Sequence, residues 1–511
     1  MDDNDNTAPL VEKVEQYSSL EEIIEECVGD FGWIQFLQVV LVSLVWMFDS
    51  QQTFISIFTD AEPSWHCLPG YSCASNTCFL PESSWSWDMP RRASVVSEWS
   101  LECASSLVTG LPTSSFYLGT LVGGFLLVSL ADSSFGRKNT MVLSCIVMSI
   151  SGLLSALSTN IWMYSVLRFV SGFGKAMMGT CSLVLSSELV GRKWRGQTGT
   201  IGFFFFTLGF LSLPGIAYMN RGSSWRVMYL WTCTPGLVYC LLVYLFVHES
   251  PRWLFIHGRK EEFLRTLRLI GPKKKGDVLT LASISSISIT KNSETMNMYS
   301  SLKLLFERKW AIRRLMAAMV VGFGVGIVYY GLPLGVGNLN FSMYLSTVLN
   351  ALSEFPATLI TYFIIGKAKR RKAVLILTTL CSISSLICVI TGSGKWKGVQ
   401  IAMELVSFFS ACTAFDVLLI YTLELFPTCI RNSGVTIVRQ VIVAGGAASP
   451  VLVGRGKGLV SYLVFGLAIG ICGVFVMWLP ETRGEISCDT LDEEETKESR
   501  RASRVPDNVL A

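Results

Sequence analysis

The stretch Glu188-Leu-Val-Gly-Arg-Lys-Trp-Arg195 is matched later in the chain by Glu424-Leu-Phe-Pro-Thr-Cys-Ile-Arg431, and both the Glu and the Arg are displaced by 236 residues. Two further pairs of charged phrases keep nearly the same offset: Gly136-Arg137-Lys138 with Arg370-Arg371-Lys372, and Glu249-Ser250-Pro251-Arg252 with Glu481-Thr482-Arg483. Several matches at one offset indicate an internal duplication. The chain is therefore predicted to consist of two similar halves in tandem, an arrangement typical of secondary transporters.

The composition indicates a protein that is surrounded by lipid. Of the 511 residues, 51% are hydrophobic and only 16% are charged, and the mean hydropathy is +0.48. An ordinary soluble protein carries about 25% charged residues. The net charge of only +4 at pH 7 argues against a nucleic-acid partner, because nucleic-acid-binding proteins present a strongly basic surface.

Long apolar stretches predict transmembrane helices, because a helix needs about 20 mostly apolar residues to cross a bilayer. Few stretches alternate as strands do, so the expected fold class is an all-α membrane protein with two pseudo-symmetric bundles of six helices. The twelve predicted spans are residues 34–57, 106–131, 140–158, 161–187, 197–217, 226–247, 312–332, 343–366, 373–392, 397–421, 434–454 and 459–479.

The distribution of basic residues predicts the orientation, because cytosolic loops of membrane proteins are enriched in Lys and Arg. Residues 251–310 contain twelve Lys or Arg, whereas residues 58–105 contain only Arg91 and Arg92. Both termini are therefore expected in the cytosol. The predicted organisation is a cytosolic tail (1–33), a first bundle (34–247) with an external loop (58–105), a basic linker (248–311) that begins with an amphipathic stretch, a second bundle (312–479) and a charged, disordered tail (480–511).

The external loop contains four of the fifteen cysteines, and an oxidising compartment favours disulfide bonds there. Four cysteines allow three pairings into two disulfides, and the sequence does not choose among them. Free thiols are the alternative. No metal site is expected, because His66 and Cys67 are an isolated pair without further ligands at zinc spacing. The candidate disulfide cysteines are Cys67, Cys73, Cys78 and Cys103.

Several phrases, in order along the chain, resemble the major facilitator superfamily and, within it, the organic ion transporter family. Ser97-Glu98-Trp99-Ser100-Leu101-Glu102-Cys103 resembles the phrase that ends the family's large external loop. The other phrases that carry the resemblance are Tyr329-Tyr330-Gly331-Leu332, Glu354-Phe355-Pro356-Ala357, Glu249-Ser250-Pro251-Arg252-Trp253-Leu254 and Pro480-Glu481-Thr482-Arg483-Gly484. The match to the plant organic cation/carnitine transporters is close and runs from the first helix to the last. It implies the two-bundle fold and the transport of small organic ions.

Charges at the cytosolic helix ends are candidates for a network that joins the two halves when the inner gate is shut. The alternative is that they only fix the topology of the helices in the membrane. Asp132 departs from the superfamily pattern, because it lies four rather than three residues before Gly136. The candidate gating charges are Asp132, Arg137, Lys138, Glu188, Arg195, Glu424 and Arg431.

Charged residues inside a membrane are functional candidates, because a lone charge there costs about 3 kcal/mol or more. Glu404 and Arg439 lie nearer to the helix ends and are less informative. The functional interpretation places at least Lys175 and Glu354 on a water-filled cavity between the halves. The alternative is an ion pair between packed helices. The candidates for substrate binding are Asp49, Lys175, Glu354 and Asp416.

Aromatic residues in the spans are further candidates, because they can hold a cationic head group by cation–π attraction worth roughly 0.5–2 kcal/mol. Phe203 to Phe206 cover every face of one helical turn and are assigned to packing. The candidates are Trp46, Phe48, Tyr329 and Tyr330, and packing is the alternative for each. Lys175 opposite Glu354 would complement a zwitterion such as carnitine.

The predicted function is secondary active or facilitative transport of small organic cations or zwitterions by alternating access. The alternatives are a sugar or other polar-solute porter of the same superfamily and a non-transporting nutrient sensor on the same scaffold. An enzyme is not expected, because the three histidines form no cluster and no nucleophile–base pair is evident. A nucleotide is not expected either, because the chain has no Gly-x-x-x-x-Gly-Lys-Ser/Thr phosphate loop.

The energy source is then a gradient, and no cofactor is expected. Proton coupling through Glu354 or Asp49, sodium coupling and uniport are open alternatives. The expected partners are the solute and the lipid bilayer, and the protein is expected to act as a monomer. The resemblance is compatible with either the vacuolar membrane or the plasma membrane.

Overall fold

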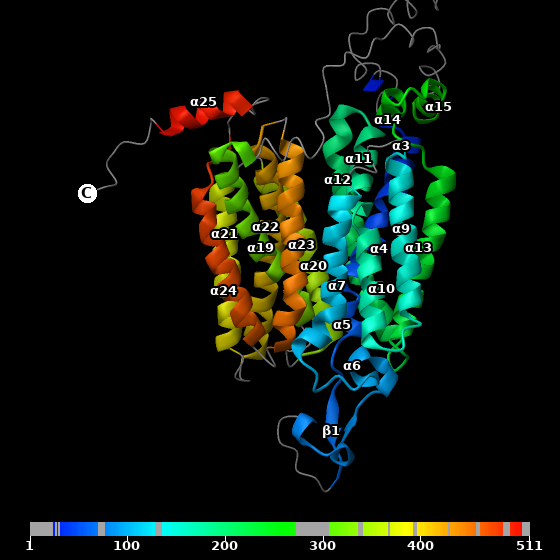
Figure 1. Cartoon of the computed structure of the whole chain (residues 1–511), viewed down its shortest axis with the longest axis vertical. Helices are drawn as coiled ribbons and strands as arrows, with labels where there is room; N and C mark the ends of the chain where they lie inside the picture. The colour runs from blue at the N-terminus through cyan, green and yellow to red at the C-terminus, as the bar shows by residue number, and fades with distance from the viewer. Residues whose placement is uncertain are drawn as a thin grey trace, which may run out of the picture.

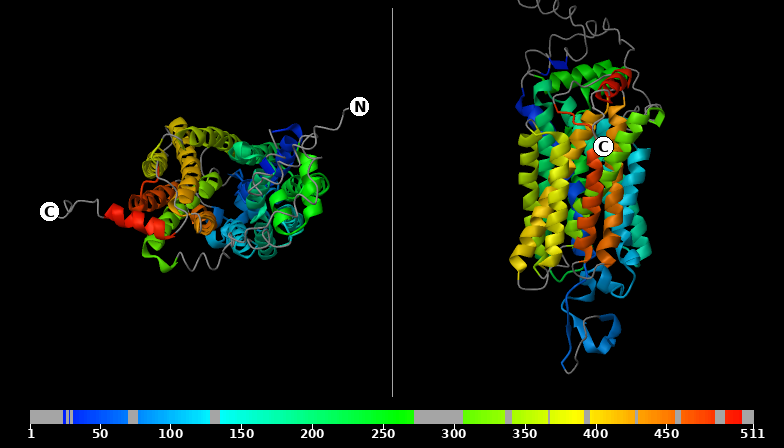
Figure 2. Two further views of the ribbon diagram at one scale, coloured as in Figure 1. Left: turned by 90° about the horizontal axis from the view of Figure 1, so that it is seen from above. Right: turned by 90° about the vertical axis from the view of Figure 1, so that its left-hand side faces the viewer.

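A computed structural model describes residues 24–25, 28, 31–69, 77–127, 135–271, 306–335, 341–365, 368–391, 396–427, 430–455, 460–483 and 491–502. These residues form twelve helical columns of membrane length in two groups of six, which confirms the predicted all-α fold (Figure 1). Seen along the columns, the two groups stand side by side (Figure 2). The chain therefore consists of two bundles, as the repeated phrases predict.

The first bundle begins with three consecutive helices that form one column, since Leu44 and Ile55 at their junctions are themselves helical. Its fourth column is interrupted at Ala176 and Met177. In chain order the columns are α3 (Trp33–Ser43) with α4 (Val45–Phe54) and α5 (Ser56–Thr59), α7 (Ser106–Leu126), α9 (Arg137–Ser155), α10 (Ile161–Lys175) with α11 (Met178–Glu188), α12 (Arg195–Met219) and α13 (Arg226–Phe246). The short helix η4 (Arg192–Trp194) precedes α12.

The second bundle repeats this order of six columns. They are α19 (Lys309–Gly335), α20 (Met343–Ile365), α21 (Arg370–Ile390), α22 (Lys397–Leu425), α23 (Arg431–Arg455) and α24 (Val460–Val474) with η6 (Phe475–Trp478). Within the described residues, nine columns are long and apolar enough to be recognised as membrane spans from composition alone. The other three are α7, the interrupted α10–α11 column and α20. Polar side chains explain part of this difference, because α7 buries Thr113, Ser114 and Ser115.

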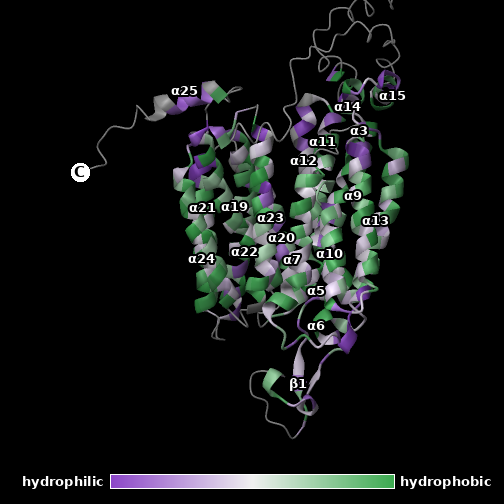
Figure 3. Ribbon diagram, viewed as in Figure 1, coloured by the Kyte–Doolittle hydropathy of each residue, from purple (hydrophilic) through white to green (hydrophobic). Residues whose placement is uncertain are grey.

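Apolar residues predominate along the columns of both bundles (Figure 3), and many large apolar side chains are exposed while many polar ones are buried. Leu241 and Leu245 of α13, for example, are exposed. By contrast, Ser410 and Thr413 of α22 are buried, and each donates a hydrogen bond to the backbone carbonyl one turn earlier. Apolar surface exposed to this extent requires lipid as the solvent.

The two bundles meet through two equivalent contacts. The second column of the first bundle, α7, packs on the fifth column of the second bundle, α23. The fifth column of the first bundle, α12, packs in turn on the second column of the second bundle, α20. Each contact therefore pairs the second column of one bundle with the fifth column of the other, as expected for a duplicated chain.

Glycines allow the closest helix crossings inside each bundle. In the first bundle, a Cβ atom on Gly172 of α10 would collide with the backbone carbonyl of Phe116 on α7. In the second bundle, a Cβ atom on Gly326 of α19 would collide with the carbonyl of Ile442 on α23. Small residues at such crossings bring helix backbones into van der Waals contact, which is a main source of packing energy in membranes.

The segments outside the bundles define two ends of the molecule. We call the end that carries strands β1 (Trp65–Cys67) and β2 (Trp85–Trp87) the loop end, and the opposite end, which carries α14 (Pro251–Ile256), α15 (Lys260–Ile270) and α25 (Leu491–Ala502), the linker end (Figure 1). β1 and β2 pair antiparallel, with Trp65 opposite Trp87. The loop end also carries η1 (Thr77–Phe79), η2 (Glu82–Ser84), η3 (Arg91–Ala93) and α6 (Val95–Glu98).

The expectation that the charged C-terminal tail is disordered is wrong for α25. This helix supplies Glu494 and Glu498 to the buried guanidinium group of Arg314 on α19, at 2.8 and 2.6 Å. Arg314 also donates a hydrogen bond of 2.9 Å to the carbonyl of Leu425 at the end of α22. A buried guanidinium group needs acceptors, and carboxylates from an otherwise polar segment provide them.

Candidate functional site

The repeated charges at the linker end form the same contacts in both bundles. In the first bundle, Arg137 Nε on α9 lies 3.9 Å from Glu188 Oε2 on α11. In the second bundle, Arg370 Nη2 on α21 lies 3.0 Å from Glu424 Oε1 on α22. Both contacts join the third column of a bundle to its fourth, although Arg370 corresponds to Gly136 rather than to Arg137 in the repeated phrase.

A second repeated contact lies beside each ion pair. The carboxylate of Glu249 accepts hydrogen bonds from the backbone N–H of Lys138, at 3.1 and 3.0 Å, at the start of α9. Glu481 accepts one of 2.7 Å from the backbone N–H of Arg370 at the start of α21. A carboxylate at a helix N-terminus stabilises the unpaired N–H groups there. Burial raises the pKa of Glu249 above its ordinary value, and these N–H groups act in the opposite direction.

The ion pair of Arg137 with Glu188 lies within the first bundle. Lys138 donates a hydrogen bond of 2.9 Å to the carbonyl of Tyr244, and Arg431 donates one of 3.3 Å to the carbonyl of Phe426. Arg195 is the first residue of α12. Asp132 lies outside the described residues. The idea that these charges join the two halves when a gate is shut therefore stays a prediction.

In the middle of the first bundle, Lys175 forms an ion pair with Asp49. Lys175 Nζ on α10 lies 2.9 Å from Asp49 Oδ1 on α4, and the two side chains are 11% and 5% exposed. The hydroxyl group of Thr53 lies between them, 2.6 Å from Lys175 Nζ and 3.3 Å from Asp49 Oδ1. No ion pair joins Lys175 to Glu354 in the part of the chain that the structure describes. Lys175 thus fits the alternative interpretation, an ion pair between packed helices.

In the second bundle, by contrast, Glu354 on α20 is buried without a basic partner among the described residues. Its Oε1 accepts a hydrogen bond of 2.8 Å from the hydroxyl of Tyr329 on α19. Its Oε2 accepts a long hydrogen bond of 3.5 Å from the hydroxyl of Thr207 on α12, which belongs to the first bundle. Asp416 on α22 lies near enough for its charge to interact with that of Glu354. Glu354 thus lies where the bundles meet, and Asp416 lies within electrostatic range of it.

Aromatic rings surround Tyr329. The ring of Phe415 stacks on it with centroids 4.9 Å apart, and the ring of Phe54 from the first bundle meets it edge-on at 6.4 Å. Its neighbour Tyr330 contacts Tyr117 of α7, with centroids 4.8 Å apart. Both tyrosines therefore lie at the contact between the bundles, beside the Glu354 carboxylate.

Two other aromatic candidates pack inside the first bundle. Trp46 on α4 contacts Phe203 and Phe206 of α12, with ring centroids 5.8 and 6.1 Å apart. Phe48 packs on Tyr239 of α13 at 5.2 Å. The assignment of the Phe203 to Phe206 run to packing agrees with these contacts.

Arg168 is a buried charge that the sequence analysis overlooks. It lies on α10, seven residues before Lys175, and therefore faces the same side of the helix about two turns away. Its guanidinium carbon lies 4.2 Å from the centre of the Phe116 ring, and Nη2 donates a hydrogen bond of 3.2 Å to the carbonyl of Gln52. Nε and Nη1 of Arg168 are buried without a hydrogen-bond partner. The signal in the sequence was a second basic residue at helical spacing from Lys175.

Arg439, to which the sequence analysis gave little weight, bridges the two bundles. Its Nη1 on α23 donates a hydrogen bond of 2.9 Å to Thr180 Oγ1 on α11. Together with the contact between Glu354 and Thr207, it ties the bundles together near their middle.

The loop end contains a cavity of about 630 Å³ between the bundles. The first bundle lines it with Phe58, Asp60 and Tyr218, and the second bundle lines it with Tyr344 and other residues. The Asp60 carboxylate is held by hydrogen bonds from the hydroxyl groups of Tyr164 (2.9 Å), Thr59 (2.9 Å) and Thr113 (3.2 Å).

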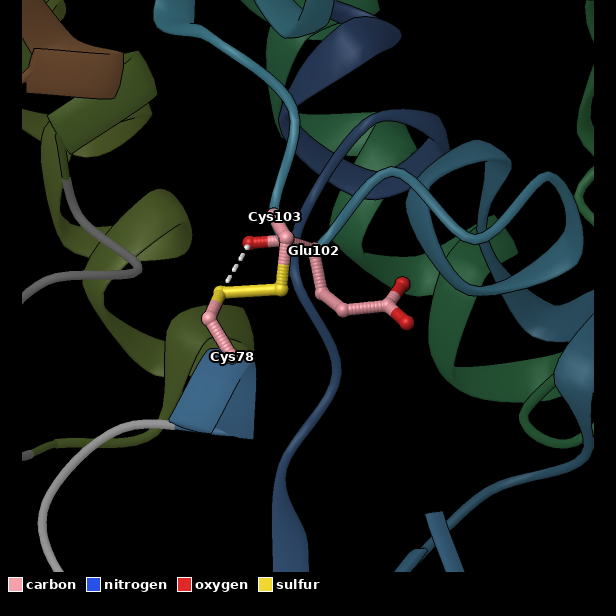
Figure 4. The surroundings of a disulfide bond; sticks show 3 residues. All are labelled: Cys78, Glu102 and Cys103. Atoms are coloured by element: carbon pink, nitrogen blue, oxygen red, sulfur yellow. Dashed lines mark hydrogen bonds between the residues drawn. A yellow bond between two sulfur atoms is a disulfide. The ribbon is translucent and has the colours of Figure 1, made fainter. Parts of the chain in front are cut away.

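At the loop end, a disulfide bond joins Cys78 to Cys103, with Cα atoms 5.5 Å apart (Figure 4). It fastens η1 to the residues that precede α7. Cys67 is also disulfide-bonded, and Cys73 lies outside the described residues. The structure therefore selects the pairing of Cys78 with Cys103 from those that the sequence left open.

Comparisons with known proteins place the chain among transporters. The profile of the family described as "Sugar (and other) transporter" matches residues 66–489. Organic cation/carnitine transporter 3 of Arabidopsis thaliana is 54% identical over 491 residues, which cover 94% of this chain and 94% of that protein. Organic cation/carnitine transporter 2 of the same plant is 51% identical over 510 residues, which cover 96% of this chain and 97% of that protein.

Among solved structures, the inward open conformation of the xylose transporter XylE from E. coli is similar with a TM-score of 0.65 and 19% identity. The match covers 90% of this chain and 98% of that chain. At this identity the likeness concerns the fold alone, and that fold is the one described above. The chain is therefore an integral multi-pass transporter of the major facilitator superfamily, and it belongs to the sugar (and other) transporter family together with the organic cation/carnitine transporters of Arabidopsis.

Proposed function

We propose that the protein transports small organic cations or zwitterions such as carnitine by alternating access. The observation that carries this proposal is the Glu354 carboxylate, which is buried between the bundles without a basic partner among the described residues. A buried carboxylate of this kind is stabilised by a cation. The rings around Tyr329 supply aromatic faces, which attract quaternary ammonium groups. The similarity to organic cation/carnitine transporters of Arabidopsis supports the same substrate class.

The zwitterion's carboxylate has a separate candidate partner in Lys175. Because Lys175 is engaged with Asp49 in this structure, a substrate carboxylate must compete with Asp49 for it. Protonation of Asp49 would release Lys175, and this exchange would couple substrate binding to a proton. We therefore infer proton symport as the coupling, in preference to sodium symport or uniport.

Alternating access requires that contacts between the bundles form and break. The hydrogen bonds from Thr207 to Glu354 and from Arg439 to Thr180 cross from one bundle to the other, so they are the contacts expected to change. The ion pairs at the linker end keep each bundle rigid while it rotates, because they lie within one bundle. On this view a monomer is sufficient for transport.

The linker end is proposed to face the cytosol, with both termini on that side. Its excess of Lys and Arg supports this orientation, since basic residues are retained in the cytosol during insertion. The disulfide at the loop end supports it as well, because disulfides persist in oxidising compartments. The vacuolar membrane and the plasma membrane both satisfy these constraints, and imaging of a fluorescent fusion in plant cells distinguishes them.

Uptake into proteoliposomes tests the proposal. Purified protein should accumulate labelled carnitine and tetraethylammonium, and an inward proton gradient should increase carnitine accumulation. Glu354→Gln should abolish uptake of both substrates, whereas Lys175→Gln should impair carnitine more than tetraethylammonium. Saturable binding of carnitine without uptake would instead identify a sensor. Uptake of xylose or glucose, but of neither cation, would identify a sugar porter.

A further inference from the structure

A second carboxyl group is buried deeper in the second bundle. Glu404 on α22 is 0% exposed, and its Oε1 accepts a hydrogen bond of 2.9 Å from the side-chain amide of Asn350 on α20. Asn350 is itself fully buried. This pair is distinct from the Glu354 site and has no role in the transport steps described above.

The surroundings of Glu404 provide no positive charge. The titratable groups that face it are the thiol of Cys388 on α21 and the phenol of Tyr462 on α24, and neither is a cation. On α20 the facing group is the neutral amide of Asn350. Among the described residues, no basic side chain forms an ion pair with Glu404. An ionised carboxylate in such surroundings costs several kcal/mol, so the neutral acid is the stable form.

A proton would also satisfy the hydrogen-bonding pattern. Glu404 Oε2 and Asn350 Oδ1 are both buried without a hydrogen-bond donor. Glu404 and Asn350 already share one hydrogen bond, and each has one acceptor atom left without a donor. A hydrogen atom on one of these two acceptors explains both. A proton on Glu404 turns Oε2 into a donor, and Asn350 Oδ1 is then available as its acceptor. The acid and the amide would thus satisfy each other on both edges.

We propose that Glu404 and Asn350 form a proton-binding site, in which the neutral carboxyl group holds α20 against α22. The location gives this proton a consequence for transport. Asn350 lies one helical turn before Glu354 on α20, and α22 also carries Asp416. Loss of the proton would leave a buried charge without a partner, so it would loosen the two helices that position these substrate-binding acids.

Infrared difference spectroscopy of the purified full-length protein tests the proton directly. The wild-type spectrum minus that of Glu404→Gln should contain the carbonyl band of one protonated carboxyl group, and this band should shift in D2O. The matched control is Glu261→Gln at an exposed position of α15, whose difference spectrum should contain ionised carboxylate bands instead. Ionised bands from Glu404 at neutral pH would overturn the proposal. This measurement does not depend on what the protein transports.

A pH profile of uptake tests the consequence, and this step rests on the proposed function. Glutamine at position 404 can accept a hydrogen bond from Asn350 and donate one to it, as the neutral acid does. The Glu404→Gln variant should therefore keep its uptake at neutral pH. At alkaline pH, its uptake should fall less than that of the wild type. Identical pH profiles for the wild type and Glu404→Gln, or loss of uptake in Glu404→Gln at every pH, would overturn the proposal. Absence of uptake in the wild type would refute the proposed function and leave the infrared test intact.

Discussion

Neutralising one member of the Asp49–Lys175 ion pair is expected to destabilise the protein more than neutralising both. The charged atoms lie 2.9 Å apart, and the side chains are only 5% and 11% exposed. Removal of one partner from a buried ion pair costs about 3–5 kcal/mol, because the remaining charge is poorly solvated. Lys175→Gln leaves Asp49 with the hydroxyl of Thr53, and Asp49→Asn leaves Lys175 with the same hydroxyl.

The double variant Asp49→Asn/Lys175→Gln removes both charges and leaves two amides that can bond to each other. A buried pair replaced by neutral groups of similar volume is often close to neutral in stability, so the expected loss is about 1 kcal/mol or less. The free energy of unfolding of the purified protein, measured by denaturant titration in detergent, should therefore fall in each single variant and largely recover in the double variant.

An exposed ion pair provides the matched control for this cycle. Arg259 Nη2 and Glu262 Oε1 lie 2.6 Å apart on the linker, but their side chains are 45% and 52% exposed. Water screens such a pair, so neutralising Arg259, Glu262 or both should change the free energy of unfolding by only about 0–1 kcal/mol. If the double variant of Asp49 and Lys175 is as unstable as the sum of the singles, the two charges do not compensate each other and the reasoning is refuted.

Three further predictions concern the linker end, the external loop and Glu354. Deletion of residues 491–511 removes the carboxylates that neutralise buried Arg314 and should lower the melting temperature. Deletion of residues 503–511 retains α25 and should leave the melting temperature unchanged. An equal fall in both deletions would contradict the role of α25. Cys78 and Cys103 should react with a maleimide only after reduction of the protein, and labelling of both without a reductant would rule out their disulfide. Tyr329→Phe removes the 2.8 Å hydrogen bond to Glu354. It should raise the KM of cation uptake about tenfold or more, because a hydrogen bond to a charged group contributes about 1.5–3 kcal/mol, and an unchanged KM would show that this hydroxyl does not position the acid.

The positions of the helices could be predicted from the sequence because each depends on a local property. Hydropathy locates a span within its own window, and the repeated phrases mark the same helix ends in both halves. The structure adds the physical reason for the repetition. Each phrase supplies either an ion pair, as in Arg137 with Glu188, or an acceptor for a helix N-terminus, as in Glu249 with Lys138.

The partners of the buried charges could not be predicted in the same way. A sequence gives the depth of a charge in the membrane but not the rotation of its helix, and the rotation decides which neighbour it meets. Lys175 and Glu354 lie at similar depth, yet Lys175 meets Asp49 of its own bundle. The helix α25 was missed for a related reason. Its charged composition resembles a disordered tail, and its ion pairs with Arg308 and with the buried Arg314 explain why it is ordered.

The two bundles share a backbone arrangement but differ in their buried charges, and this difference bears on how the protein binds a cation. In the first bundle the acid Asp49 is neutralised by Lys175. In the second bundle, Glu354 and Asp416 have no basic partner in the described residues, and the cation Arg439 is directed to Thr180 of the opposite bundle.

A cationic substrate therefore meets acidic side chains without a basic partner on one side of the contact and a closed ion pair on the other. Binding of the cation alone leaves the Asp49–Lys175 ion pair closed. Binding of a zwitterion also requires the first bundle to open its ion pair, which makes the selection between the two substrate classes depend on the strength of the contact between Asp49 and Lys175.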